Sequence, residues 1–489
     1  MNDFTNFITE IMNLKDLDAF DIIHLPSDDG QIILQIEHKP TVKTCPLCGF
    51  RMHSKGIYTR TVRHPLLVDN RIFTFKLRQR KWLCQNPDCC HFETDSFPFI
   101  GKSRRITDYV DFLIVQEFRD FNLSAVQIAE KYKVSDTYAL SVFDRYVDLP
   151  RLKLPSALCV DEVHMNIDKY KYALILQDFA SGEPVDIVIS RRKEITEPYF
   201  ASIPKEERFS VKYIISDMYA PYQKYVDTYF PKAIPVIDAF HVIKMINHKL
   251  NIYLNRVRKK YKDRDIRLLE EKQKSSSKKL VLHESRELYL LRTKKWLILS
   301  NQDKINYNAP PFRDWRFNNT LMTVSDYERA LFDLDPDLEI LRNLKEKYIT
   351  FNNQYTGNSD GARTAIDEVI QLYRDCGYPM FEEVAEALTQ YKSAIINSFI
   401  LLSRKDRNGH TFKARLSNGP MESLNRIPKD MKRHARGYTS FAHIRNRFLF
   451  STRENAPILA SPKKSEDVKN ITGKTRGSYR KHGGKKNEN

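Results

Sequence analysis

Two aspartates in this sequence end short apolar runs, which is a placement that suits metal chemistry. Asp161 follows "SALCV" and Asp217 follows "VKYIIS", and each run has the length of a buried strand. Carboxylates at the ends of neighbouring strands supply the oxygen ligands that hard divalent cations prefer. Two such cations about 4 Å apart activate a water or a 3′-hydroxyl and stabilise the leaving oxygen of a phosphodiester. The pair predicts phosphodiester chemistry, which needs a third carboxylate to complete two octahedral shells.

Glu422, in the stretch "LSNGPMESLNRIPKD", is the candidate for that third carboxylate. The stretch reads as a helix with an apolar stripe on one face. A second face carries four polar side chains at i, i+3, i+4 and i+7: Glu422, Asn425, Arg426 and Lys429. This face combines a metal ligand with polar and cationic groups for phosphates. Pro428 is expected to kink or end the helix.

Each acid also has a purely structural interpretation. Asp161 would cap the end of a strand, Asp217 would serve a turn, and Glu422 would form a surface ion pair with Arg426. The joint placement of the three in one order of elements favours the metal site. Asp238, in "VIDAFHVIK", would be either a fourth acid near the metals or the N-cap of the following helix, and we favour the cap.

The elements around the acids follow a recognisable order. Three strands come first, the last two joined through Ser181-Gly182, and then helix, strand, helix and strand up to about residue 240. This order suggests a ribonuclease-H-like α/β core. Strand alternation places Glu162 on the face opposite Asp161, so we do not count it as a ligand. A simple core of this kind needs far fewer residues than separate Asp217 from Glu422, and residues 240–400 have a helical pattern.

Five of the seven cysteines lie close together in the first hundred residues. "CPLCG" provides Cys45 and Cys48, and "CQNPDCC" provides Cys84 with Cys89 or Cys90. Two such knuckles suit a structural, tetrahedral zinc ion. We favour Cys89 as the fourth ligand, because the preceding Pro-Asp pair can form the turn. The alternative is a set of free cytosolic thiols.

The stretch "NLSAVQIAEKYKVSDTYALSVFDRYV" predicts two short helices in the manner of a helix-turn-helix. Ser124 would cap the first helix, a turn would follow at Lys133-Val134, and Ser135 would cap the second. Three residues of the first helix are expected to face inward: Val126, Ile128 and Ala129. The second helix would enter the major groove of DNA with Thr137 and Tyr138 at its reading end. The alternative is an ordinary packed helix pair.

The net charge of +18 indicates an anionic partner, and nucleic acid is the commonest one. The candidate DNA-binding residues are Arg78, Arg80, Lys81, Arg104, Arg105, Thr137, Tyr138, Arg426, Lys429, Lys432 and Arg433. No apolar run approaches the roughly 18 residues that a membrane span needs, and no signal peptide is evident, so we expect a cytoplasmic protein without a membrane partner.

Taken together, these motifs resemble the insertion-sequence transposases of the DDE class, and most of all the ISL3 family. The matching segments include "CPLCG", "VDEVH", "SDMYAPY", "DAFHVIK" and "SNGPMESLNRIPKDMKRHARGYTSFAHIRNRFLF". The resemblance implies that Asp161, Asp217 and Glu422 are a catalytic triad that uses Mg²⁺ (or Mn²⁺), with a helical insertion before the glutamate. It also implies double-stranded DNA partners, namely terminal inverted repeats and target DNA, and a homodimer or larger assembly on the bacterial nucleoid.

The predicted fold class is multidomain α/β: a ribonuclease-H-like core with a long helical insertion, preceded by a zinc-binding segment and a helix-turn-helix. The expected regions are residues 1–100 with the cysteines, 101–150 with the helix-turn-helix, 151–240 as the first part of the core, 241–405 as the insertion, 406–455 as the last part of the core, and 456–489 as a disordered basic tail. Two other functions fit the sequence, a DNA-binding regulator with a degenerate core and a structure-specific nuclease without strand transfer.

Overall fold

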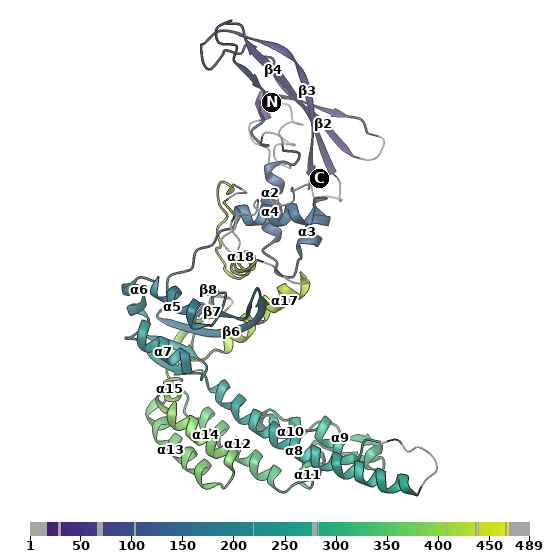
Figure 1. Cartoon of the computed structure of the whole chain (residues 1–489), viewed down its shortest axis with the longest axis vertical. Helices are drawn as coiled ribbons and strands as arrows, with labels where there is room; N and C mark the ends of the chain where they lie inside the picture. The colour runs from purple at the N-terminus through teal and green to yellow at the C-terminus, as the bar shows by residue number, and fades with distance from the viewer. Residues whose placement is uncertain are drawn as a thin grey trace, which may run out of the picture. The chain divides into compact units, whose positions relative to one another are not determined.

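A computed structural model describes the chain from residue 17 to residue 464, together with 467–468 (Figure 1). Residues 28–30, 66–71, 102–103, 219, 276–280, 282, 407, 436–437 and 439 lie outside the described residues, as do 465–466 and 469–489 of the predicted tail. The chain forms two compact units. The first unit comprises 1–151, 163–173 and 426–489, and the second comprises 152–162 and 174–425. No described helix is both long and apolar enough to cross a membrane.

The first unit begins with a five-stranded sheet in the order β1-β2-β4-β3, with β5 paired to β4. The strands are β1 Phe20–Leu25, β2 Ile32–His38, β3 Met52–Pro65, β4 Ile72–Cys84 and β5 Phe92–Thr94. Alternation along β4 buries Phe75 and Leu77 completely against Leu34 and Ile36 of β2. The sequence predicted β2 and β4, and β4 runs antiparallel to the long β3 and so returns the chain to Cys84, beside the first cysteine pair.

The helices of the first unit are α2 Asp108–Glu117, α3 Ala125–Lys131, α4 Asp136–Tyr146, α17 Arg426–His434 and α18 Phe441–Thr452. Both predicted N-caps are confirmed, since the hydroxyl of Ser124 accepts from the N–H of Gln127 and that of Ser135 from the N–H of Tyr138. Ile128 and Ala129 are buried as predicted, but Val126 is 52% exposed, so that prediction was wrong. The buried Tyr132 shifts the inward face of α3 away from Val126.

The second unit contains a five-stranded sheet in the order β10-β9-β6-β7-β8. The strands are β6 Ala157–Ile167, β7 Tyr170–Asp178, β8 Pro184–Val188, β9 Tyr213–Ser216 and β10 Ile234–Ile237. β7 and β8 are antiparallel, whereas β9 is parallel to both β6 and β10. One prediction was wrong: β6 does not end at Asp161 but runs on to Ile167, because alternating burial continues along it. The end of β6 and the start of β7 cluster with the first unit.

Three helices follow the strands of this sheet: α5 Lys193–Ala201, α6 Lys205–Ser210 and α7 Ala220–Tyr229. Phe200 of α5 and Tyr222, Tyr225 of α7 pack in one buried cluster with Leu158 and Val160 of β6. Because side chains alternate along a strand, this packing leaves the neighbouring positions of β6 to the other face of the sheet. That other face carries Asp161.

The long segment after β10 is mostly helical, as its pattern predicted. The helices are α8 Ala239–Lys274, α9 Arg286–Thr293, α10 Trp296–Leu299, α11 Val324–Phe332, α12 Asp337–Gln354, α13 Ser359–Asp375, α14 Pro379–Gln390 and α15 Lys392–Asn397. Helix α8 links two apolar clusters, one around Val242, Ile246 and Leu250 and the other around Leu254 and Val257.

Two small hairpins interrupt this helical segment, and the sequence did not predict them. The first pairs β11 Phe312–Asp314 with β12 Thr320–Met322. The second pairs β13 Leu401–Lys405 with β14 Thr411–Arg415. The second hairpin leads directly into α16 Gly419–Leu424, which carries Glu422.

Candidate active site and metal centre

Asp161 lies in the middle of β6, on the face away from α5 and α7, and it is half-buried. Its Oδ1 accepts a hydrogen bond from the backbone N–H of Glu162 at 2.7 Å, and its Oδ2 accepts one from Nδ2 of Asn425 at 2.8 Å. Burial raises the pKa of this carboxyl, and the negative charge of Asp217 raises it further, while His241 offsets part of the rise. A bound divalent cation would lower the pKa again, because it stabilises the ionised carboxylate.

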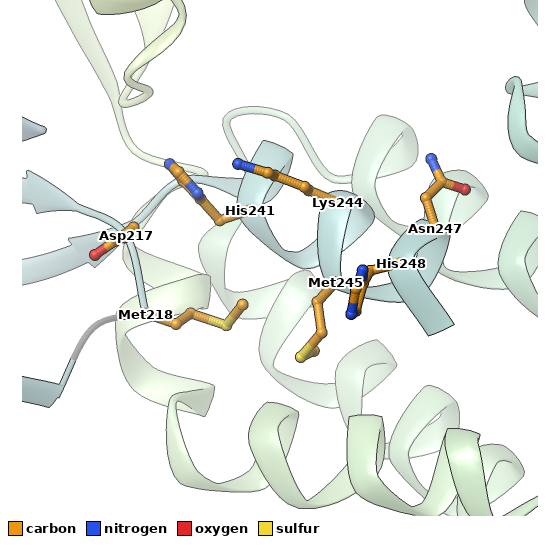
Figure 2. Close-up of a pocket in the computed structure, with 7 residues that line it drawn as sticks. All are labelled: Asp217, Met218, His241, Lys244, Met245, Asn247 and His248. Carbon is orange, nitrogen blue, oxygen red and sulfur yellow. The ribbon is translucent and has the colours of Figure 1, made fainter. Parts of the chain in front are cut away.

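Asp217 follows β9 directly, as predicted, and it occupies the same register as Asp161. Cys159 of β6 pairs with Ile215 of β9, so the positions two residues further along are Asp161 and Asp217. Asp217 also lines an open pocket of about 640 Å³. Figure 2 shows that the rest of the pocket wall comes from Met218 and the first turns of α8: His241, Lys244, Met245, Asn247 and His248.

Glu422 is exposed on α16, and the start of this helix is anchored to the sheet. Asn418, just before α16, is 1% exposed. Its Nδ2 donates to the carbonyl oxygen of Val160 at 3.2 Å, and its backbone N–H donates to Oδ2 of Asp238 at 2.9 Å. The other oxygen of Asp238 caps α8 by accepting from the N–H of Phe240 at 3.1 Å, which confirms the predicted cap. Asp238 therefore ties the starts of α8 and α16 together.

The end of α16 is held by Asn425, the residue that donates to Asp161. Two hydrogen bonds, from Asn418 and Asn425, thus fix the helix of Glu422 along β6 at Val160 and Asp161. Sequence analysis placed Asn425 on a polar face for phosphates and missed this contact, which no local pattern signals. The helix is interrupted near Pro428 as expected: α16 stops at Leu424, whose carbonyl would need the N–H that Pro428 lacks, and Pro428 itself lies in the first turn of α17.

Asp161, Asp217 and Glu422 do not form a tight cluster. Among the described residues, only the cysteines form a group of three or more potential ligands whose atoms all lie within 4.8 Å of one another. Glu162 faces away as predicted: it accepts a hydrogen bond from the Tyr222 hydroxyl at 2.8 Å and forms an ion pair with Arg191. The three acids therefore offer oxygen donors, the ligand type that Mg²⁺ or Mn²⁺ prefers, in an open arrangement.

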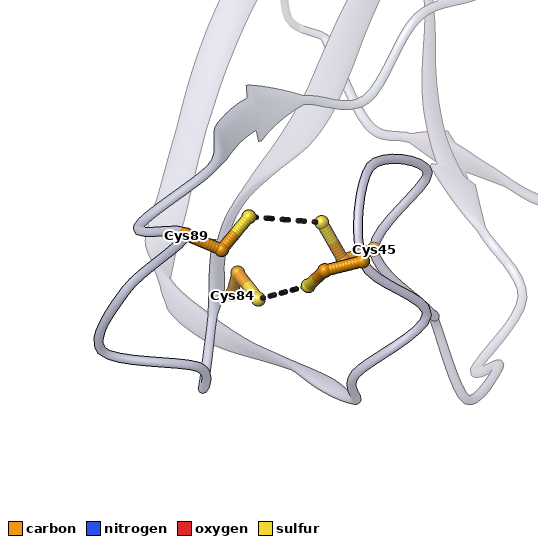
Figure 3. A group of neighbouring side chains, drawn as sticks. Cys45, Cys84 and Cys89 are labelled. Atoms are coloured by element: carbon orange, nitrogen blue, oxygen red, sulfur yellow. Dashed lines mark hydrogen bonds between the residues drawn. The ribbon is translucent and has the colours of Figure 1, made fainter.

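The four predicted zinc ligands come together in the first unit (Figure 3). The Sγ atoms of Cys45 and Cys89 are 3.7 Å apart, and those of Cys48 and Cys84 are 3.4 Å apart. Four thiolates bound to one zinc at about 2.3 Å would lie about 3.8 Å from one another, so the group fits tetrahedral zinc. The Sγ of Cys90 instead donates to the carbonyl of Pro87 at 3.0 Å, so Cys89 is the cysteine that joins the other three.

The surroundings of the cysteines explain why they converge. Gly49, with φ of +72°, closes the first knuckle by donating its N–H to the carbonyl of Cys45 at 2.9 Å. Trp82 and Met52 pack beside the sulfurs. A hydrogen bond from the Phe50 backbone lowers the pKa of Cys48 to about 7, whereas burial raises the pKa of Cys84 to about 12. Zinc would supply the positive charge that buried thiolates need.

Several of the predicted DNA-binding residues have partners within the protein. Arg78 and Arg80 both form ion pairs with Glu37, at 2.8 Å. Arg104 forms ion pairs with Asp108 and Asp111 and donates to the Tyr138 hydroxyl at 2.7 Å. These contacts hold β4 and the helices in place.

Of the remaining predicted DNA-binding residues, some also have partners within the protein and others do not. Lys432 donates to the carbonyls of Met165 and Asn166, Arg433 forms an ion pair with Asp430 at 3.0 Å, and the Thr137 hydroxyl donates to Asp136 at 3.3 Å. Of the predicted DNA-binding residues, four are exposed cations with no ion-pair partner within the described parts of the chain: Lys81, Arg105, Arg426 and Lys429. Those four are the ones most available to phosphates.

Comparison with known proteins identifies the family of this chain. A family model described as a transposase, of the ISL3 type of DDE transposases, matches residues 158–448. The match covers more than half of the chain and includes all three acids. The chain is also 23% identical over 314 residues to the transposase for insertion sequence element IS1001 of Bordetella parapertussis, an overlap of 62% of this chain and 70% of that protein. The chain therefore belongs to the ISL3 family of DDE transposases.

Proposed function

We propose that the chain cleaves the DNA ends of its own insertion sequence and joins them to target DNA. Asp161, Asp217 and Glu422 would hold two Mg²⁺ (or Mn²⁺) ions. The observation that carries this proposal is the shared register of Asp161 and Asp217 on adjacent parallel strands, with the helix of Glu422 bonded to Asp161 through Asn425. The strand order, with β9 and β10 added in parallel to the β6 side of three antiparallel strands, supports assignment of a ribonuclease-H-like core.

The reaction has two steps that use the same groups. In the first, water attacks the phosphorus at the element's end, the bond to the 3′-oxygen breaks, and a 3′-hydroxyl and a 5′-phosphate result. In the second, that 3′-hydroxyl attacks a phosphodiester of the target, a new ester forms and the target's own 3′-oxygen leaves. The metal ions would activate each attacking oxygen and stabilise each leaving oxygen.

The chain's own residues orient these groups. Asn425 occupies Oδ2 of Asp161 and so fixes the plane of that carboxylate. Lys244 lines the pocket beside Asp217 and is exposed, which places a cation where a phosphate would enter. Asn418 and Asp238 hold the start of the Glu422 helix. These contacts prepare the site before DNA arrives.

The first unit would bind the terminal inverted repeats. The four cysteines would hold a structural zinc that shapes the end of the sheet, and α4 would enter the major groove as the second helix of a helix-turn-helix. Lys81, Arg105 and the start of α4 would contact DNA, whereas Arg104 and Tyr138 would position α4 through Asp111. Pairing of two element ends makes a homodimer or larger assembly the expected working form.

A plasmid cleavage assay with the full chain tests this proposal. The Asp217→Asn variant should lose cleavage and strand transfer by on the order of 10³-fold, because a metal ligand contributes several kcal/mol in the transition state. The matched control is Asp227→Asn, which changes an exposed acid of α7. Undiminished, metal-dependent cleavage by Asp217→Asn would refute the triad. Cleavage by the wild type without joined products would point to a nuclease, and DNA binding without cleavage to a regulator.

A further inference from the structure

The first two thirds of α8 carry many positive charges and no negative ones. Residues 239–262 contain seven Lys and Arg residues and no Asp or Glu. Immediately after Lys262 the composition changes, and acids appear among the cations at Asp263, Asp265, Glu270 and Glu271. A helix face that only meets solvent gains from opposite charges three or four residues apart. The second part of α8 follows this rule and the first part does not.

The exposed side of this first part is a continuous stripe. The side of α8 that packs inward carries Val242, Ile246, Leu250, Leu254 and Val257, all 4% exposed or less. The opposite side carries polar side chains spaced three, four or seven residues apart, which we call the basic track: His241, Lys244, His248, Asn255, Lys259 and Lys262. His241 is half-buried and the other five are exposed. The track therefore faces outward along the helix.

The cations of the basic track are not neutralised by neighbours. In the parts of the chain that the structure describes, Lys244, Lys259 and Lys262 have no ion-pair partner. On other sides of the same helix, Lys249 pairs with Glu383, and Arg264 pairs with Asp265 at 2.7 Å. Unpaired like charges destabilise a helix slightly, so a stripe of them indicates an external anion.

Each end of the basic track opens into a pocket. At the first end, His241, Lys244 and His248 share the pocket of Asp217, and Figure 2 shows His241 and Lys244 extending to the same side of α8. At the other end, Lys259 and Lys262 line a second pocket of about 470 Å³. The only acid described there is Glu284, which is already bonded to Arg292 at 2.7 Å.

We propose that the basic track binds the sugar–phosphate backbone of the DNA whose scissile phosphate lies at Asp217. This inference rests on the proposed function and adds the path of the DNA away from the active site. From His241 to Lys262 the helix rises about 32 Å, which is the length of roughly nine base pairs of duplex. Lysines spaced along a helix make ionic contacts that carry no sequence information, so the track positions DNA rather than reads it.

The salt dependence of DNA binding tests the track. The probe is a random-sequence duplex of about 30 base pairs, titrated with the full chain in EDTA so that no cleavage occurs. The test variant is Lys244→Gln/Lys259→Gln/Lys262→Gln. The control is Lys304→Gln/Lys347→Gln/Arg363→Gln, which removes the same charge from exposed positions elsewhere in the second unit. The slope of log K against log salt should fall by about 2 to 3 for the test variant and by less than about 1 for the control.

A second readout uses the wild-type chain, so it does not depend on how the variants fold. Acetylation of lysines, read by mass spectrometry, should slow at Lys244, Lys259 and Lys262 when the duplex is added, and stay unchanged at Lys304 and Lys347. Equal slopes for the two variants, or equal protection of the two lysine sets, would contradict the proposal that the basic track binds DNA. If the wild type fails to bind duplex at all, the proposed function itself fails, which is a different result from loss of the track alone.

Discussion

The two candidate metal sites of this protein are built in opposite ways. The four cysteines come from two knuckles at one end of β3 and β4, and their sulfurs already lie within 4.8 Å of one another. The three carboxylates come from β6, the end of β9 and α16, they form no such cluster, and Asp217 lines an open pocket. A closed set of soft ligands suits a structural ion, whereas an open set of hard ligands leaves room for substrate. The difference therefore favours a structural role for the cysteines and a catalytic role for the carboxylates.

The largest expected effect is loss of the cysteine site. In Cys84→Ser, zinc content measured by mass spectrometry should fall by about one ion per chain, and the N-terminal sheet should become sensitive to protease. The cause is that structural zinc contributes on the order of 10 kcal/mol to the folding of small domains. The control is Cys90→Ser, whose sulfur bonds to a carbonyl outside the group. A Cys84→Ser chain that keeps its zinc would show that the four thiols are not its ligands.

Substitution in the carboxylate group should reduce activity and leave the fold of the first unit unchanged. Asp161→Asn is expected to reduce cleavage and strand transfer together by on the order of 10³-fold, because it removes a metal ligand that both steps share. Zinc content and protease resistance of the N-terminal sheet should remain those of the wild type. If Asp161→Asn also released zinc, the two regions would not be independent, and the comparison between them would fail.

A smaller effect is expected at Asn425, a positioning residue for Asp161. Asn425→Ala should lower cleavage by about 10- to 100-fold, the usual cost of losing a group that orients a metal ligand. The variant should recover part of its activity at higher Mg²⁺ concentration, which a general folding defect would not do. The control is Ser423→Ala, an exposed position on the same helix. Equal Mg²⁺ dependence for Asn425→Ala and wild type would remove Asn425 from the site.

The smallest expected effect concerns pH. Because burial raises the pKa of Asp161, its ionised form destabilises the folded chain, and this cost disappears as pH falls through the raised pKa. In EDTA, Asp161→Asn should therefore unfold at higher urea than the wild type at pH 7, and the difference should shrink on acidification. Urea titrations across this range measure it. A difference that grows on acidification would mean that Asp161 is stabilised as an anion.

Local patterns in the sequence predicted much of this architecture and of both candidate sites. Knuckle spacing identified Cys45, Cys48 and Cys84, a turn at Pro87-Asp88 favoured Cys89 over Cys90, and the apolar runs located the five strands of the core sheet. Helix caps at Ser124 and Asp238 were also predictable, since a cap acts within one turn.

Contacts between distant segments were not predictable. The bond from Asn425 to Asp161 joins residues that are far apart in the chain, and nothing near either of them signals it. The extension of β6 past Asp161 was missed because a carboxylate was taken as the end of a strand that alternation in fact continues. Five candidate DNA contacts, Arg78, Arg80, Arg104, Lys432 and Arg433, were named without their internal partners, because charge alone does not reveal a neighbouring acid or carbonyl.

Asp238 gives these observations a mechanical meaning. One of its oxygens holds the first turn of α8 and the other holds the backbone just before α16. If α8 binds DNA as proposed, a displacement of its first turn would act through this one carboxylate on the backbone just before α16. The starts of α8 and α16 therefore cannot move apart without breaking a hydrogen bond to Asp238, so DNA binding on α8 would be coupled mechanically to the position of Glu422.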